Sequence, residues 1–274
     1  MSSDSAAVEV QGEETPLLGE SRTASRIRDH LNRWGDCRAE FYGTGLFVAL
    51  GLSVNAALLT NPAITSTAAA VLGALGWGIA LMVGMAVAAP ISGGHVNPAI
   101  TLGFVLRRQI SWGKAIGYMV AQYLGAFVGA ALTHLLFLQS MHRREDTGAD
   151  NLDIFASFSS AHVNQLTAFL CELTGAGVLT VVVANFARAS SSDANKAWMP
   201  FATGLAFTAL VIIFGHQTGG MFNPARDFGP RVYTLVAGWG FQAFSARHLY
   251  FWVPLVAPFF GAVLGMLEFV LFLT

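Results

Sequence analysis

Six apolar stretches of about 20 residues each dominate this chain, and each is long enough to cross the hydrocarbon core of a bilayer. They lie near residues 39–60, 68–90, 115–138, 165–187, 199–215 and 249–272. Lipid offers no partners to backbone N–H and C=O groups, so stretches of this kind must satisfy those groups internally as helices. The sequence therefore predicts an all-α membrane protein with six transmembrane helices.

The composition is that of a protein surrounded by lipid. Of the 274 residues, 54% are hydrophobic and 11% are charged, compared with about 25% charged residues in soluble domains. A net charge of −1 gives no basis for binding nucleic acid. No nucleophile–base set and no cluster of metal ligands is apparent along the sequence, so we expect no enzyme, no cofactor and no metal site.

The chain contains the same tripeptide twice, as Asn97-Pro98-Ala99 and Asn223-Pro224-Ala225, 126 residues apart. In both copies small residues lead to an Asn that can cap a helix, and proline follows at the first helical position, where no N–H is needed. The helices expected at 97–107 and 223–235 are too short to span a bilayer, so we predict two re-entrant half-helices. Irregular backbone at this depth persists only where it is buried in protein or lines water.

The similarity of the two halves extends beyond the tripeptides. Residues 39–45 in the first span resemble residues 171–177 in the fourth, and Gly125–Gly129 in the third matches Gly261–Gly265 in the sixth. The glycine pairs are small-xxx-small patterns, which we interpret as helix-packing sites. Because each half contains three spans, the second half is inverted relative to the first, an arrangement from which transport pathways are built.

The organisation of the chain follows from these repeats. Residues 1–35 are rich in Ser, Glu and Arg and are predicted to form a disordered tail. The membrane domain is placed at 36–272, with repeat one at 36–138 and repeat two at 165–272. Ten of the 15 Lys and Arg residues fall on the side of the termini, so the positive-inside rule predicts two cytoplasmic termini. The segment Glu13–Leu18 is typical of an acidic dileucine sorting signal, which suggests an endosomal or vacuolar route. The expected location is the plasma membrane or an endosomal or vacuolar membrane.

Together these features resemble the aquaporin, or major intrinsic protein, family over roughly residues 36–272. The resemblance implies a bundle of six helices and two half-helices that meet at their N-termini, assembled as a homotetramer with one pore per subunit. The second tripeptide continues as Asn-Pro-Ala-Arg-Asp, and Asp227 is the mark of the glycerol-conducting branch. Arg231, Phe137 and Pro254-Leu255 agree with that branch.

Within this fold, Asn97 and Asn223 are expected to face each other at the middle of the membrane and to donate hydrogen bonds to passing oxygens. Each half-helix N-terminus behind them is equivalent to about half a positive charge. A positive midpoint repels cations and orients water so that a proton wire is interrupted. Helix capping alone would also explain both residues, and we expect them to serve in both ways.

The narrow filter of the family is found by counting from the two Asn residues. It is formed here by Trp77, Val211, Gly220 and Arg226. An ionisable residue such as Arg226 inside an apolar stretch is costly enough to suggest a function. A typical glycerol filter has a Gly and a second aromatic residue where this chain has Val211 and Gly220. The combination is closer to the nodulin-like plant branch, which admits other small neutral solutes.

Four further residues are expected to support the loops. Glu40 and Glu172 occupy matching repeat positions and resemble the paired glutamates of the family, which accept hydrogen bonds from the half-helix loops; a proton relay is the alternative. His95 is expected to anchor its loop, and Asp227 to hold the second loop against Arg231.

The predicted function is a passive channel for water and small uncharged solutes, chiefly glycerol, that excludes protons and ions. One alternative is a channel for ammonia, urea, peroxide or metalloid hydroxides through the altered filter. Another, from a different class, is a poorly conducting scaffold or adhesion protein, although the intact Asn97, Asn223 and Arg226 argue against it. A coupled transporter would need midplane carboxylates, for which Glu40 and Glu172 are the candidates.

Overall fold

The computed structural model describes residues 34–189 and 193–274. Over this part of the chain there are helices and no strands. Most of the predicted disordered tail, together with its sorting motif, lies outside the described residues.

Six of the described helices are long and apolar enough to cross a membrane, as predicted. They are α2 (Gly35–Leu59), α3 (Ser66–Ser92), α5 (Trp112–Glu145), α7 (Gln165–Ala189), α8 (Asp193–Thr218) and α11 (Trp252–Leu273). Two short helices follow the tripeptides, α4 (Pro98–Leu106) and α9 (Pro224–Thr234). The fold is therefore the predicted one, with six spans and two half-helices.

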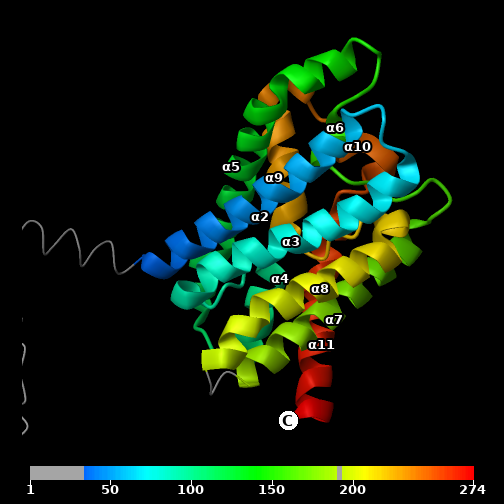
Figure 1. The fold of residues 1–274 in the computed structure, drawn as a ribbon. Coiled ribbons are helices and arrows are strands. Elements are labelled where there is room, and N and C mark those ends of the chain that lie inside the picture. Colours follow the sequence, from blue (N-terminus) through cyan, green and yellow to red (C-terminus); the bar gives the residue numbers. More distant parts are fainter. Residues whose placement is uncertain (1–33, 190–192) are drawn as a thin grey trace, which may run out of the picture. The chain divides into compact units, whose positions relative to one another are not determined.

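The two halves are packed in the same way and interlock. In the first half α2 contacts α3 and α5, and in the second α7 contacts α8 and α11, while α3 and α8 join the halves (Figure 1). Each half-helix packs against a long helix of the other half, α4 against α11 and α9 against α5. This exchange brings both Asn-Pro-Ala loops to the centre of the bundle.

Glycine allows the closest helix contacts. A Cβ atom added at Gly125 of α5 would overlap the carbonyl oxygen of Phe41 in α2, and one added at Gly261 of α11 would overlap that of Leu173 in α7. The backbones therefore touch at matching places in the two halves. The interpretation of both glycine pairs as helix-packing sites is confirmed.

Helix boundaries differ from the predicted spans where a helix continues past the apolar segment or begins late. Helix α5 runs to Glu145 rather than ending near residue 138, because the polar residues that follow continue the helix outside the apolar zone and its last turn is basic, which suits the helix dipole. Helix α11 begins at Trp252 rather than 249, since Arg247, His248 and Leu249 have positive φ angles.

The connections also contain short helices. These are α6 (Leu152–Phe155), the π-helix η1 (Leu235–Trp239) directly after α9, and α10 (Gln242–Leu249). The second half-helix therefore ends one residue before the predicted residue 235 and continues with a different hydrogen-bond register.

We predict that Gly125→Ala destabilises the protein by about 1–3 kcal/mol, because its new methyl group overpacks the contact between α5 and α2. Gly113→Ala in the same helix is the matched control, since nothing lies within 4 Å of an added Cβ there, and alanine favours a helix. Thermal unfolding of the purified protein in detergent measures both. A Gly125→Ala midpoint equal to that of the wild type would contradict the assigned contact.

Candidate functional site

The two Asn-Pro-Ala loops place an Asn at the N-cap of each half-helix. The Asn97 side-chain oxygen accepts a hydrogen bond from the backbone N–H of Ala99 at 2.9 Å. The Asn223 oxygen accepts from Ala225 at 3.0 Å and from Arg226 at 3.2 Å. Helix capping, one of the two expected roles of these residues, is thus present in the structure.

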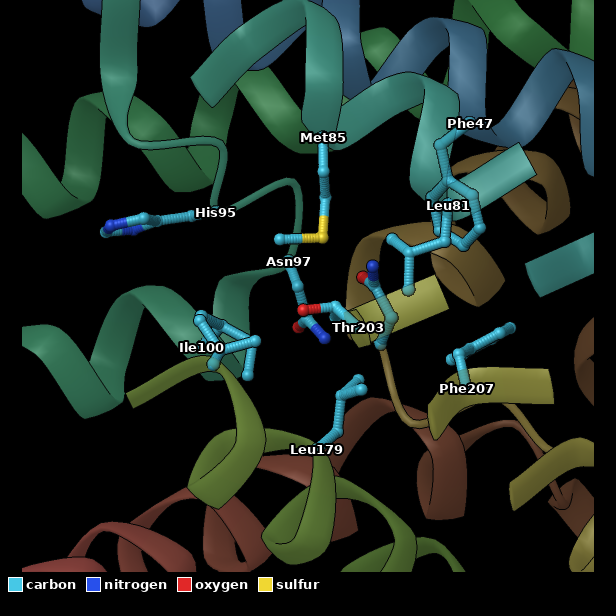
Figure 2. A pocket seen from close by; sticks show the side chains of 11 residues that line it. Phe47, Leu81, Met85, His95, Asn97, Ile100, Leu179, Thr203 and Phe207 are labelled. Carbon is cyan, nitrogen blue, oxygen red and sulfur yellow. The ribbon is translucent and has the colours of Figure 1, made fainter. Parts of the chain in front are cut away.

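The amide nitrogens of the same two residues bind across the repeat. Asn97 Nδ2 donates to the carbonyl oxygen of Phe222 at 2.9 Å, and Asn223 Nδ2 donates to that of Val96 at 2.8 Å. A side-chain amide has two N–H donors, so each Asn keeps one donor beyond this bond. Both Asn side chains line one narrow cavity of about 10 Å³, close to the smallest volume that holds a water molecule (Figure 2).

The carbonyl groups that accept these bonds belong to residues in an uncommon conformation. Val96 has φ of 42° and Phe222 has φ of 51°, which for bulky residues is sterically unfavourable. Other contacts must hold the backbone there. Both side chains are fully buried, which contributes to that restraint.

The predicted loop-supporting glutamates provide the remaining restraint. Glu40 accepts the backbone N–H groups of His95 at 2.9 Å and Val96 at 2.7 Å. Glu172 accepts those of Met221 at 3.0 Å and Phe222 at 2.7 Å. Each carboxylate therefore accepts two backbone N–H groups of the loop that precedes one half-helix.

Hydroxyl and amide groups complete the shell around each carboxylate. Glu40 also accepts from Ser92 Oγ and Gln122 Nε2, and Glu172 also accepts from Thr218 Oγ1. Both side chains are fully buried, and neither lines the cavity. Each buried carboxylate thus has several hydrogen-bond donors from the protein around it.

Two of the four predicted filter residues are stacked. The guanidinium carbon of Arg226 lies 3.8 Å from the centre of the Trp77 ring. Trp77 Nε1 donates to Asn55 Oδ1 at 2.9 Å, so the indole N–H already has a partner within the protein. Arg226 is buried, its Nη1 contacts the sulfur of Met221, and its Nε has no hydrogen-bond partner among the described residues.

The other two filter residues are in contact with each other. A Cβ atom built on Gly220 would lie 3.3 Å from both Cα and Cγ2 of Val211. Gly220 also has φ of 65°, a conformation that favours glycine. A side chain at position 220 would therefore be crowded against Val211.

Asp227 and Arg231 form the predicted pair. Arg231 Nε lies 2.6 Å from Asp227 Oδ2, and both side chains are buried. The guanidinium also donates to the carbonyl oxygens of Ser157 at 2.5 Å and of Ala243. A buried ion pair with its remaining donors satisfied fixes α9 to the two neighbouring connections.

His95 is buried and lines the cavity from the first loop. Its Nδ1 lies 3.1 Å from Thr101 Oγ1, and its ring stacks at 4.4 Å from Phe104. These contacts agree with the predicted anchoring of the loop.

Sequence reasoning missed most of the cavity wall, which is contributed by side chains without an individual motif. The missed residues are Phe47, Leu81, Met85, Ile100, Leu179, Val183, Thr203 and Phe207. A signal existed: Leu81 and Met85 follow Trp77 at steps of four, and Thr203 and Phe207 precede Val211 at the same steps, so they share a helix face with filter residues.

Comparison with known proteins agrees with this geometry. A family model described as "Major intrinsic protein" matches residues 28–269. The chain is similar to Aquaglyceroporin-2 of Rhizophagus irregularis, with 36% identity over 83% of this chain and 73% of that one, and to Aquaporin-9 of Homo sapiens, with 32% identity over 85% and 80%.

The fold is also similar to the X-ray structure of the aquaglyceroporin from Plasmodium falciparum, with a TM-score of 0.76 and 30% identity over 85% of this chain and 94% of that one. Members of the matched family are passive channels for water and small solutes rather than enzymes. The fold, the paired loops and these similarities lead to one conclusion: this chain belongs to the major intrinsic protein family.

Proposed function

We propose that this member of the family conducts water and small uncharged solutes, chiefly glycerol, and excludes protons and ions. The observation that carries the proposal is the meeting of Asn97 and Asn223 in one cavity, each with an amide donor beyond its cross-repeat hydrogen bond. A hydroxyl or water oxygen at this point can accept both donors, whereas a cation finds only donors and two positive helix ends.

The stacked pair Trp77 and Arg226 supports glycerol as the main organic solute. The indole N–H is engaged by Asn55, so the ring offers only its hydrocarbon surface, and the guanidinium over the ring offers charged donors. A polyol can make both kinds of contact, because its carbon chain can pack on the ring and its hydroxyls can accept hydrogen bonds from the guanidinium. Aquaglyceroporin-2 and the Plasmodium protein are named for this class of channel.

The contact between Val211 and Gly220 favours a second candidate function. Because the predicted filter has Val211 and Gly220 where a typical glycerol filter has a Gly and a second aromatic residue, it lacks the second aromatic face that would cradle a carbon chain. Solutes without a long carbon chain, such as ammonia, urea, peroxide or metalloid hydroxides, need no such face. We keep this wider solute range as the alternative.

The assembly and the placement in the membrane belong to the same proposal. We propose a homotetramer with one pore per subunit, a channel domain at 36–272 and two cytoplasmic termini in the plasma membrane or an endosomal or vacuolar membrane. The excess of Lys and Arg on the side of the termini supports the orientation.

Stopped-flow light scattering on proteoliposomes tests the proposed solutes. An inward sorbitol gradient should cause fast shrinkage, and an inward glycerol gradient should cause shrinkage followed by fast reswelling. Replacing Arg226 by Leu should slow reswelling at least tenfold, because hydrogen bonds to a charged group of about 1.5–3 kcal/mol are lost. Shrinkage without reswelling in the wild type would contradict glycerol conduction, and no response to either gradient would favour a scaffold.

We further predict that Val211→Ala raises glycerol permeability relative to water permeability several-fold, because it removes two methyl groups from the filter wall. Ile213→Ala on the same helix is the control, since that side chain is 60% exposed on the bundle surface. Equal ratios in the Val211→Ala variant and the wild type would show that this wall does not limit glycerol.

A further inference from the structure

Most buried threonines of the bundle have a hydrogen bond, but the hydroxyls of Thr203 in α8 and Thr44 in α2 have no partner among the described residues, and of these two only Thr203 lines the cavity. The hydroxyls of Thr133, Thr180 and Thr208 each donate to the carbonyl oxygen four residues earlier in their own helix. The Thr203 side chain is 1% exposed, yet its Oγ1 has no hydrogen-bond partner among the described residues. Leaving a buried hydroxyl unpaired costs free energy, so a molecule that hydrogen-bonds to Thr203 from outside the chain would be stabilised there.

The cavity supplies the place for such a partner. Thr203 lines the same cavity as Asn97 and Asn223, and Figure 2 shows its side chain among those of the wall. Most of that wall is apolar, including Phe47, Leu81 and other hydrocarbon side chains. A neutral hydroxyl can both donate and accept, so Thr203 offers a hydrogen bond on a stretch where the wall offers few.

The repeat gives Thr203 a position relative to the filter. Asn97 corresponds to Asn223 with an offset of 126 residues, and the same offset pairs Trp77 with Thr203 and Ile100 with Arg226. Because the halves are inverted, corresponding residues lie toward opposite ends of the pore. Thr203 and Ile100 thus occupy, at one end, the places that Trp77 and Arg226 occupy at the other.

We propose that Thr203 is a specificity-determining residue whose hydroxyl binds a hydroxyl group of a passing polyol. It forms a second, uncharged binding station at the opposite end of the pore from the Trp77–Arg226 filter. This inference rests on the proposed function, because it concerns the organic solutes of the same pore. A polyol that fills the cross-section must find its partners on the wall, whereas water in single file also bonds to neighbouring water.

Three variants test the station in the stopped-flow assay, with water, glycerol and the smaller diol ethylene glycol as solutes. Thr203→Val keeps the shape and removes the hydroxyl, so permeability to both polyols should fall about tenfold, while water permeability changes less than twofold. Thr203→Ser keeps the hydroxyl and should retain the wild-type ratio of polyol to water permeability. Thr208→Val, in the same helix but outside the cavity wall, should also leave that ratio unchanged.

The outcomes separate this inference from the proposed function. Suppose that the wild type conducts a polyol and that Thr203→Val keeps the wild-type ratio of polyol to water permeability. The binding station at Thr203 is then refuted, while the proposed function stands. The same holds if Thr203→Ser loses as much polyol permeability as Thr203→Val. If the wild type passes ethylene glycol but not glycerol, the proposal of glycerol conduction fails. The ethylene glycol permeabilities of the Thr203 variants then test the binding station. A wild type that passes neither polyol overturns both.

Discussion

The pore depends on two buried carboxylates that accept backbone N–H groups. Glu40 and Glu172 accept hydrogen bonds that help to offset the steric cost of the positive φ angles of Val96 and Phe222. Held in this conformation, the two loops present their carbonyl oxygens to the Asn side chain of the opposite repeat. The charge of each glutamate thus acts through the backbone, at a distance from any solute in the pore.

The cross-repeat hydrogen bonds join two halves that also meet through helix packing and through the contact of Arg226 with Trp77. Each half-helix packs on a long helix of the other half, and each Asn binds the other loop, so neither half can form its part of the pore alone. Trp77 and Arg226, one residue from each half, are stacked, and Thr203 lines the cavity that Asn97 and Asn223 share.

Much of this arrangement could be predicted because it is carried by local patterns. The spans follow from the length of the apolar stretches, and the half-helices follow from the Asn-Pro-Ala tripeptides. The repeat shows that Glu40 and Glu172 occupy corresponding positions in the two halves. The end of α5 and the contact between Val211 and Gly220 could not be predicted, since hydropathy does not mark where a polar helix stops and spacing does not show which walls touch. Thr203 was missed because an unpaired hydroxyl is a property of its surroundings rather than of its residue type.

The shortness of the half-helices has a consequence for how the protein enters a membrane. At about 1.5 Å per residue, the nine residues of α4 and the eleven of α9 reach roughly half of a hydrocarbon core of about 30 Å. Alone in lipid, each would leave its connecting backbone without partners. Biogenesis therefore has an order: the long helices must assemble first, and the two loops fold inward afterwards, when the glutamates are in place to receive them.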